Sequence, residues 1–274
     1  MTDTTGAPPV VQLDEYSRLS QLYFPVAVWT ETLLYGVYAC LFIATTRIML
    51  KKQAAESFAS RVFLVAGTIN FILGTLHVAF ALFRLIRAYA LLVVPPYPIF
   101  YLFDFNRWDN FSHLVILALM TWVADGLVIY RCFLIWRRNY WIIILPTLLV
   151  LISMAMTFVN WRWFKHPEDF DPNVIKHIFN MVFPLNLAQN VITTSLIAAK
   201  IYMQHRASQR SGLQLSSAIN LITIIRIIVE SAMIYTILTV IIIILLFTLN
   251  PAVAIPQQCL APVIGEPIRN PFYR

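Results

Sequence analysis

The chain has 274 residues, of which 59% are hydrophobic and only 12% are charged, and its mean hydropathy is +0.73. Soluble domains average about 45–50% apolar and about 25% charged residues, so this composition excludes an ordinary soluble protein. The net charge is +7. No run of about five or six basic residues exists, and the Lys and Arg residues stand beside apolar stretches, which is typical of membrane topology and not of nucleic-acid binding.

Apolar stretches long enough to cross a bilayer recur along the chain. A spanning helix needs about 20 mainly apolar residues, and lipid leaves an unpaired backbone group without a partner, so each span must be helical. The predicted full spans cover 26–48, 62–86, 111–136, 141–160, 177–203 and 219–248, and a short or incomplete seventh covers 251–265. We therefore expect an all-α, polytopic transmembrane helix bundle in 26–265, with a polar outer tail in 1–25 and a short tail in 266–274.

Basic residues concentrate on one side of the predicted bundle. The loop after the first span holds Arg47, Lys51, Lys52 and Arg61, and two further loops form a predicted cytoplasmic basic face of Arg131, Arg137, Arg138, Lys200, Arg206 and Arg210. The opposite side holds seven Lys and Arg residues against these ten. Because cytoplasmic loops carry the excess of Lys and Arg, the N-terminus is predicted outside. The basic face is where a cytoplasmic signalling partner would bind.

The longer loops lie on the predicted outer side and are rich in aromatic residues. They cover 88–110, with Pro95, Pro96 and Pro98, and 161–176, with Trp161 and Trp163. Such residues either form the interfacial aromatic belt or a lid over a cavity that opens outward. The first loop also contains a glycosylation sequon at Asn110, which abuts the membrane and which we do not expect to be modified.

Polar residues inside the spans mark function by default, because burying them in a membrane is costly. Counted from the span ends, five of them reach similar depths in the inner half: Asn70, Asp125, Asn190, Arg226 and Glu230. We predict that they form one intramembrane polar cluster, with Arg226 and Glu230 paired at i,i+4. Alternatively, Arg226 snorkels at the inner interface. Glu31 is expected near the outer end of the first span, within reach of water.

The sequence offers no recognisable metal or cofactor motif. The cysteines Cys40, Cys132 and Cys259 form no CxxC pair, and neither His77 nor His113 has a second histidine at ligand spacing on its own helix. We expect both histidines to be ordinary bundle residues, with no catalytic residue, metal or cofactor. Pro146 and Pro184 fall inside spans and are expected to kink them.

Three blocks of residues resemble the conserved blocks of a large family of seven-helix integral membrane proteins from basidiomycete fungi. The blocks are Glu31–Gly36 with Leu41 and Phe42, Trp122–Cys132 with Trp136, and Glu230 and Ser231 with Tyr235. The resemblance covers about 20–265 and implies a multi-pass fungal membrane protein with an outer N-terminus; it implies no activity. The family pattern continues a seventh helix where this chain turns to Glu266, so we expect an atypical, truncated C-terminus.

Two functions remain open at this stage. A receptor-like or signalling heptahelical protein is favoured by the orientation, the basic inner loops and the proline in the fifth span. The alternative is a small-solute or proton transporter that uses Asp125, Arg226 and Glu230. An enzyme is not expected, because five scattered histidines do not supply a clustered nucleophile or metal site. The lipid bilayer is the expected partner in both cases, and nucleic acid is not.

Overall fold

The structure is a computed structural model and describes residues 14–51, 58–91, 98–210 and 233–265. Five of its helices are long and apolar enough to cross a membrane. They are α1 (Glu15–Lys51), α2 (Phe58–Ile86) with the π-helical turn η2 (Arg87–Leu91), α4 (Trp108–Ile135), α5 (Tyr140–Lys165) and α6 (Pro172–Arg210). The described residues contain no strand, so the predicted all-α class is confirmed.

Shorter helices complete the described part of the chain. They are α3 (Pro98–Phe103), the 3-10 turns η3 (Pro167–Asp169) and η4 (Pro251–Val253), α8 (Ala254–Gly265), and an apolar helix Met233–Phe247. The first part of the predicted sixth span, with Arg226 and Glu230, lies outside the described residues. The predicted seventh span is α8, whose 12 residues rise only about 18 Å at 1.5 Å per residue.

The first span begins earlier than the sequence predicts. Helix α1 starts at Glu15, where the Asp14 side chain accepts a hydrogen bond from the Ser17 backbone N–H at 3.2 Å. An aspartate in this position caps the free amides of a first turn. Helical structure therefore covers residues that were expected in the polar tail, and Pro25 lies inside the helix.

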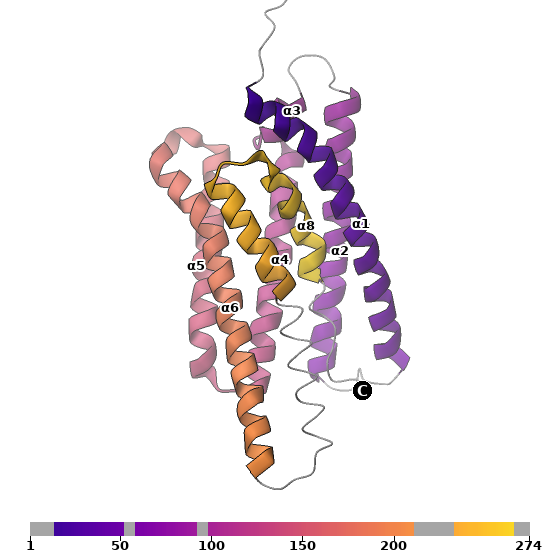
Figure 1. Cartoon of the computed structure of the whole chain (residues 1–274), viewed down its shortest axis with the longest axis vertical. Coiled ribbons are helices and arrows are strands. Elements are labelled where there is room, and N and C mark those ends of the chain that lie inside the picture. The colour runs from indigo at the N-terminus through magenta and orange to yellow at the C-terminus, as the bar shows by residue number, and fades with distance from the viewer. Residues whose placement is uncertain (1–13, 52–57, 92–97, 211–232, 266–274) are drawn as a thin grey trace, which may run out of the picture.

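Helix α4 is the centre of the bundle. It packs against α2 on one side and against α5 and α6 on the other, and α8 contacts α1, α2 and α4. Figure 1 shows α5 and α6 on the opposite side of α4 from α1. One tight contact between α2 and α4 lies at Gly74, where an added Cβ would stand 3.4 Å from the Met120 side chain.

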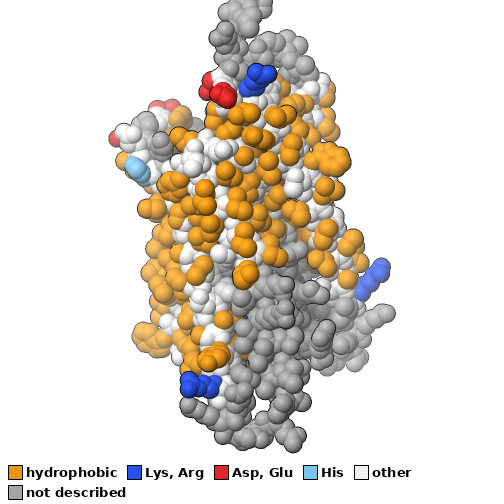
Figure 2. All heavy atoms as spheres, in the orientation of Figure 1, with side chains coloured by type: hydrophobic (Ala, Val, Ile, Leu, Met, Phe, Trp, Pro, Cys, Tyr) orange, Lys and Arg blue, Asp and Glu red, His pale blue; other side chains and the backbone are white. Residues whose placement is uncertain are grey.

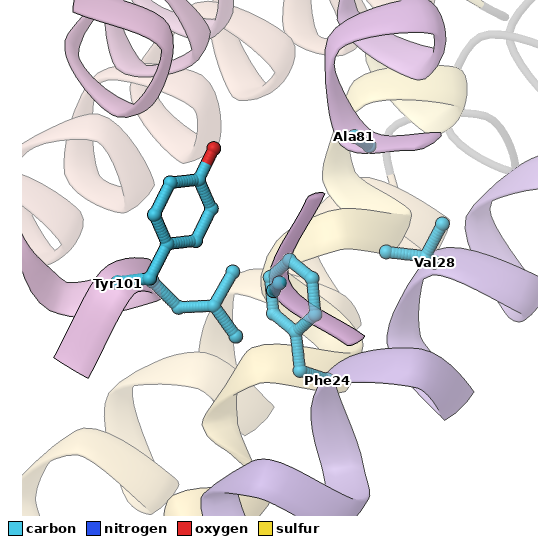
Figure 3. Close-up of a cluster of buried hydrophobic side chains, with 6 residues drawn as sticks. Phe24, Val28, Ala81 and Tyr101 are labelled. Carbon is cyan, nitrogen blue, oxygen red and sulfur yellow. The ribbon is translucent and has the colours of Figure 1, made fainter. Parts of the chain in front are cut away.

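The end of the bundle at which α1 begins, called the outer end after the predicted orientation, is held by an apolar cluster. Phe24 and Val28 of α1, Ala81 of α2 and Tyr101 of α3 bury their side chains together. Figure 3 shows the Tyr101 ring beside this cluster, with its hydroxyl turned away from Phe24. Burial of such side chains contributes about 1.5–3 kcal/mol each, which anchors α3 against the ends of α1 and α2.

The lateral surface of the bundle, along the sides of the helices, is apolar. Trp141 is 83% exposed and Trp29 is 69% exposed. Figure 2 shows hydrophobic side chains over the middle of one face, with charged side chains at its two ends. Large exposed apolar surfaces are costly in water and are satisfied by lipid. The helix lengths and this surface together place the chain in a membrane.

Candidate functional site

Three ionisable side chains from three helices meet inside the outer half of the bundle. Glu31 of α1, His77 of α2 and His113 of α4 are 0%, 0% and 4% exposed. His77 Nδ1 lies 2.5 Å from Glu31 Oε1, and the two imidazole rings have their centroids 3.9 Å apart. One donor atom from each residue lies within 4.8 Å of the other two. We call these residues the histidine site.

The histidine site is only partly satisfied by hydrogen bonds. Among the described residues, Glu31 Oε2, His77 Nε2 and His113 Nε2 are buried without a hydrogen-bond partner. Each unsatisfied buried polar atom costs about 1–3 kcal/mol. Such atoms in native structures require an explanation, of which a bound ion or water is one.

A cavity of about 130 Å³ extends from His113 toward the outer end of the bundle. Its lining includes Ser20 of α1, Arg84 of α2, His113 of α4 and Gln258 of α8. Arg84 Nε donates a hydrogen bond of 2.7 Å to Asn110 Oδ1, and the guanidinium lies over the Phe24 ring, 5.4 Å from its centroid. A small molecule or ion that enters this cavity therefore meets both a fixed cation and an imidazole.

The sequence prediction for this region is wrong in one respect and incomplete in another. Glu31 is fully buried, and is not within reach of bulk water as its place near a span end suggested. His77 and His113 were expected to be ordinary bundle residues because neither has a ligand partner on its own helix. The structure supplies those partners from neighbouring helices, which spacing along one helix cannot show.

The predicted inner-half polar cluster is described only in part. Asn70 is fully buried, and neither of its side-chain polar atoms has a partner among the described residues. Along α2, Asn70 lies between Phe63, which packs with Leu127 of α4, and Gly74, which lies against Met120 of α4. Asn70 thus lies level with the stretch of α4 that contains Asp125.

The other predicted members of the cluster are placed separately. Asp125 is half-buried and lies close enough to Tyr235 for an electrostatic interaction. Asn190 is half-buried on α6 beside the buried Gln189. Because Arg226 and Glu230 lie outside the described residues, the complete cluster stays a prediction.

The predicted basic face lies at the opposite end of the bundle from the histidine site. Arg137 and Arg138 are exposed in the turn between α4 and α5 and adopt positive φ values of 51° and 61°. Arg131 lies over the Phe63 ring at 4.9 Å, and Lys200 lies over the Trp136 ring at 4.8 Å. Arg206 is exposed. Arg210 ends α6, and its side chain is not among those described.

An aromatic pocket of about 700 Å³ opens at the outer end, between the α3–α4 connection and the ends of α5 and α6. Its lining consists of Phe103, Asp104, Phe105, Asn106, Trp163, Phe164, Pro167, Ile175 and Phe179. Phe105 and Phe164 stack with centroids 4.6 Å apart. Trp108, in contrast, is 59% exposed on the surface. The outer aromatics thus line a pocket, and the aromatic belt and the lid over a cavity stay predictions.

A group of hydrogen bonds, the outer latch, ties the α3–α4 connection to α2; it consists of Arg84, Tyr101, Asp104, Asp109 and Asn110. The Asn110 amide donates to the Tyr101 carbonyl at 2.5 Å and to the Asp104 carbonyl at 2.9 Å. The Tyr101 hydroxyl donates to the Asp109 carboxylate. Burial is the main cause that raises the pKa of Tyr101, and this hydrogen bond adds to it, so that the pKa is about 12. Asn110 is fully buried, so its sequon is inaccessible.

Comparisons with protein-family models, with curated proteins and with solved structures found no match. The resemblance to basidiomycete seven-helix membrane proteins therefore stays a prediction.

Proposed function

We propose that this protein is a receptor-like membrane protein that binds a small ligand in the aromatic pocket and signals through the basic face. One observation carries the proposal: α6 lines the pocket with Ile175 and Phe179 near its start and carries Lys200 and Arg206 of the basic face near its end. The pocket is lined by the connection into α4, by the end of α5 and by the start of α6. Each of these helices then runs to the basic end, where α4, α5 and α6 pack on one another.

The pocket has the size and chemistry of a ligand site. Small-molecule sites have volumes of about 300–1,000 Å³ and apolar, aromatic linings with a few polar groups. Here the polar groups are Asp104 and Asn106 among five aromatic rings. Aromatic faces and a carboxylate together favour a small aromatic ligand with a positive charge or a hydrogen-bond donor.

The basic end has a projection that suits a signalling partner. Helix α6 has 39 residues and is about 58 Å long at 1.5 Å per residue, whereas the hydrocarbon core is about 30 Å thick. Figure 1 shows the C-terminal end of α6 extending beyond the α4–α5 turn. With the N-terminus outside, this end and its arginines face the cytoplasm, where an acidic partner such as a G protein would bind.

The test joins ligand binding to signalling. The full chain in lipid nanodiscs is screened with small aromatic amines, with Trp163 fluorescence as the binding signal and nucleotide exchange on added G proteins as the output. Phe179→Ala in the pocket should weaken the response at least about tenfold, because a buried aromatic contact is lost. The matched control is Phe158→Ala, because the Phe158 side chain of α5 is 52% exposed. Ligand-independent exchange, or equal effects of the two variants, would refute the proposal.

Transport is the second candidate, because ionisable groups lie inside the bundle at two levels: Glu31 of α1 is fully buried and Asp125 of α4 is half-buried. Such residues serve as proton relays in pumps and transporters. The measurement is pH-dependent flux in reconstituted liposomes. Flux that vanishes in Asp125→Asn favours transport. If neither flux nor nucleotide exchange is detected, a structural role becomes the favoured function.

A further inference from the structure

We propose that the histidine site, Glu31, His77 and His113, binds one divalent transition-metal ion, with zinc the best match. The proposal goes beyond the proposed function and does not depend on the aromatic pocket. It rests on the donor atoms, their burial and the cavity beside them.

The donor set has the composition that zinc prefers. Zinc in proteins is bound by imidazole nitrogen and carboxylate oxygen at about 2.0–2.2 Å, and sites with two histidines and one glutamate keep an open fourth position. Harder cations such as Mg²⁺ and Ca²⁺ require mainly oxygen ligands, which the histidine site lacks. The set of two nitrogens and one oxygen therefore favours zinc or a neighbouring transition metal.

The spacing of the donors is close to what coordination requires. They lie within 4.8 Å of one another, whereas ligands of a tetrahedral zinc ion stand about 3.4 Å apart, from the bond lengths above. Rotations about the side-chain bonds of the three residues would bring the donor atoms to that spacing. Metal binding would consequently tie α1, α2 and α4 together at one point.

The close approach of His77 to Glu31 places two donor atoms side by side. The His77 Nδ1 lies 2.5 Å from Glu31 Oε1, so the two groups share a hydrogen bond in the absence of a metal ion. A metal ion bound by both groups would replace this bond, because ligating imidazole and carboxylate groups must be deprotonated. The His113 Nε2 is among the buried atoms that have no hydrogen-bond partner in the described part of the chain, and a metal ion would supply that partner.

The positive charge of Arg84 near the histidine site favours an anion as the fourth ligand. Arg84 lies near enough to His113 for an electrostatic interaction, and the two residues line the same cavity. The Arg84 cation opposes a bare metal ion but attracts an anion, so the open position facing the cavity suits a small anionic oxygen ligand such as hydroxide or a carboxylate.

The experiment uses the full chain in nanodiscs, stripped with a chelator and titrated with Zn²⁺ against a chromophoric competitor. We expect one tight Zn²⁺ per chain. Glu31→Gln and His113→Gln should each weaken binding by more than about tenfold, since even loss of an outer-shell partner costs 10–100-fold. His166→Gln is the matched control, because this histidine is exposed on the surface. Absence of stoichiometric binding, or equal loss in the control, would overturn the proposal.

A second measurement covers the case in which the variants fail to fold. X-ray absorption on the wild-type chain with bound Zn²⁺ should show only nitrogen and oxygen neighbours at about 2.0–2.2 Å, with the multiple-scattering pattern of two imidazoles. A sulfur neighbour at about 2.3 Å, or no imidazole signal, would exclude the site as built here.

Discussion

Asn110 provides a direct test of the outer latch. Its side chain accepts a hydrogen bond from Arg84 Nε at 2.7 Å and donates to the carbonyls of Tyr101 and Asp104. Asn110→Ala removes all three bonds and leaves the 5% exposed Arg84 without its amide partner. A hydrogen bond to a charged group is worth about 1.5–3 kcal/mol and a neutral one about 1 kcal/mol. Water can reach the exposed Asp104, so the total loss is about 3–5 kcal/mol.

The assay is thermal unfolding of the full chain in detergent, followed by the loss of the monodisperse peak on size exclusion. For chains of 150–250 residues, each kcal/mol shifts the Tm by about 2–4 °C, so Asn110→Ala should lower the Tm by about 6–20 °C. Asn173→Ala is the matched control, because Asn173 is exposed and such substitutions change stability by only about 0.5 kcal/mol. A Tm within about 2 °C of wild type would show that the latch does not stabilise the fold.

Three further predictions concern other contacts. Ser153→Ala should lower the Tm by about 2–4 °C, because it removes the 2.5 Å hydrogen bond to Asn186 that joins α5 to α6; an unchanged Tm would contradict that role. Arg138→Gly should raise the Tm by a similar amount, because glycine adopts the φ of 61° without strain, and a lower Tm would argue against a strained turn. The raised pKa of Tyr101 means that the folded state holds the phenol proton more tightly. Stability from this group is therefore present below pH 10 and is lost as the pH rises to about 12. Unfolding followed across this range should show a steeper loss in wild type than in Tyr101→Phe, and parallel losses would refute the raised pKa of Tyr101.

Much of the fold follows from apolar length alone. Each of the first five predicted spans contains the core of a long helix, because about 20 apolar residues in a row have few alternatives to a membrane helix. The ends were less predictable. Glu15 begins α1 through a local cap at Asp14, and such a cap adds helix outside the apolar segment, where hydropathy gives no signal.

The site was harder to predict, because its members come from different helices. Counting depth from the span ends singled out Asn70 and Asp125, but it treated Glu31 as exposed and the histidines as isolated. The error came from the span boundaries: with α1 beginning at Glu15 and α2 continuing into η2, Glu31 and His77 both move inward from the outer end. Depth along one helix also says nothing of which face packs against a neighbour.

One antiparallel register between α2 and α4 connects these features. Arg84 bonds to Asn110, His77 stacks near His113, and Gly74 faces Met120. A slip of α4 by one turn, about 5.4 Å, would separate all of these pairs at once. The latch and the histidine site therefore oppose sliding between these helices.

Under the proposed receptor function, movement is expected in α5 and α6, which two side-chain hydrogen bonds among the described residues link to the rest of the bundle. Trp136 of α4 donates to the Leu196 carbonyl of α6 at 3.1 Å, and Lys165 of α5 donates to the Asn106 carbonyl at 2.9 Å. Ser153, in contrast, joins α5 to α6. These bonds leave α5 and α6 able to shift together while α1, α2 and α4 stay fixed. Such a shift would change the aromatic pocket at one end and the position of Lys200 against Trp136 at the other. A metal ion at the histidine site would strengthen the fixed half, and so would confine the response to α5 and α6.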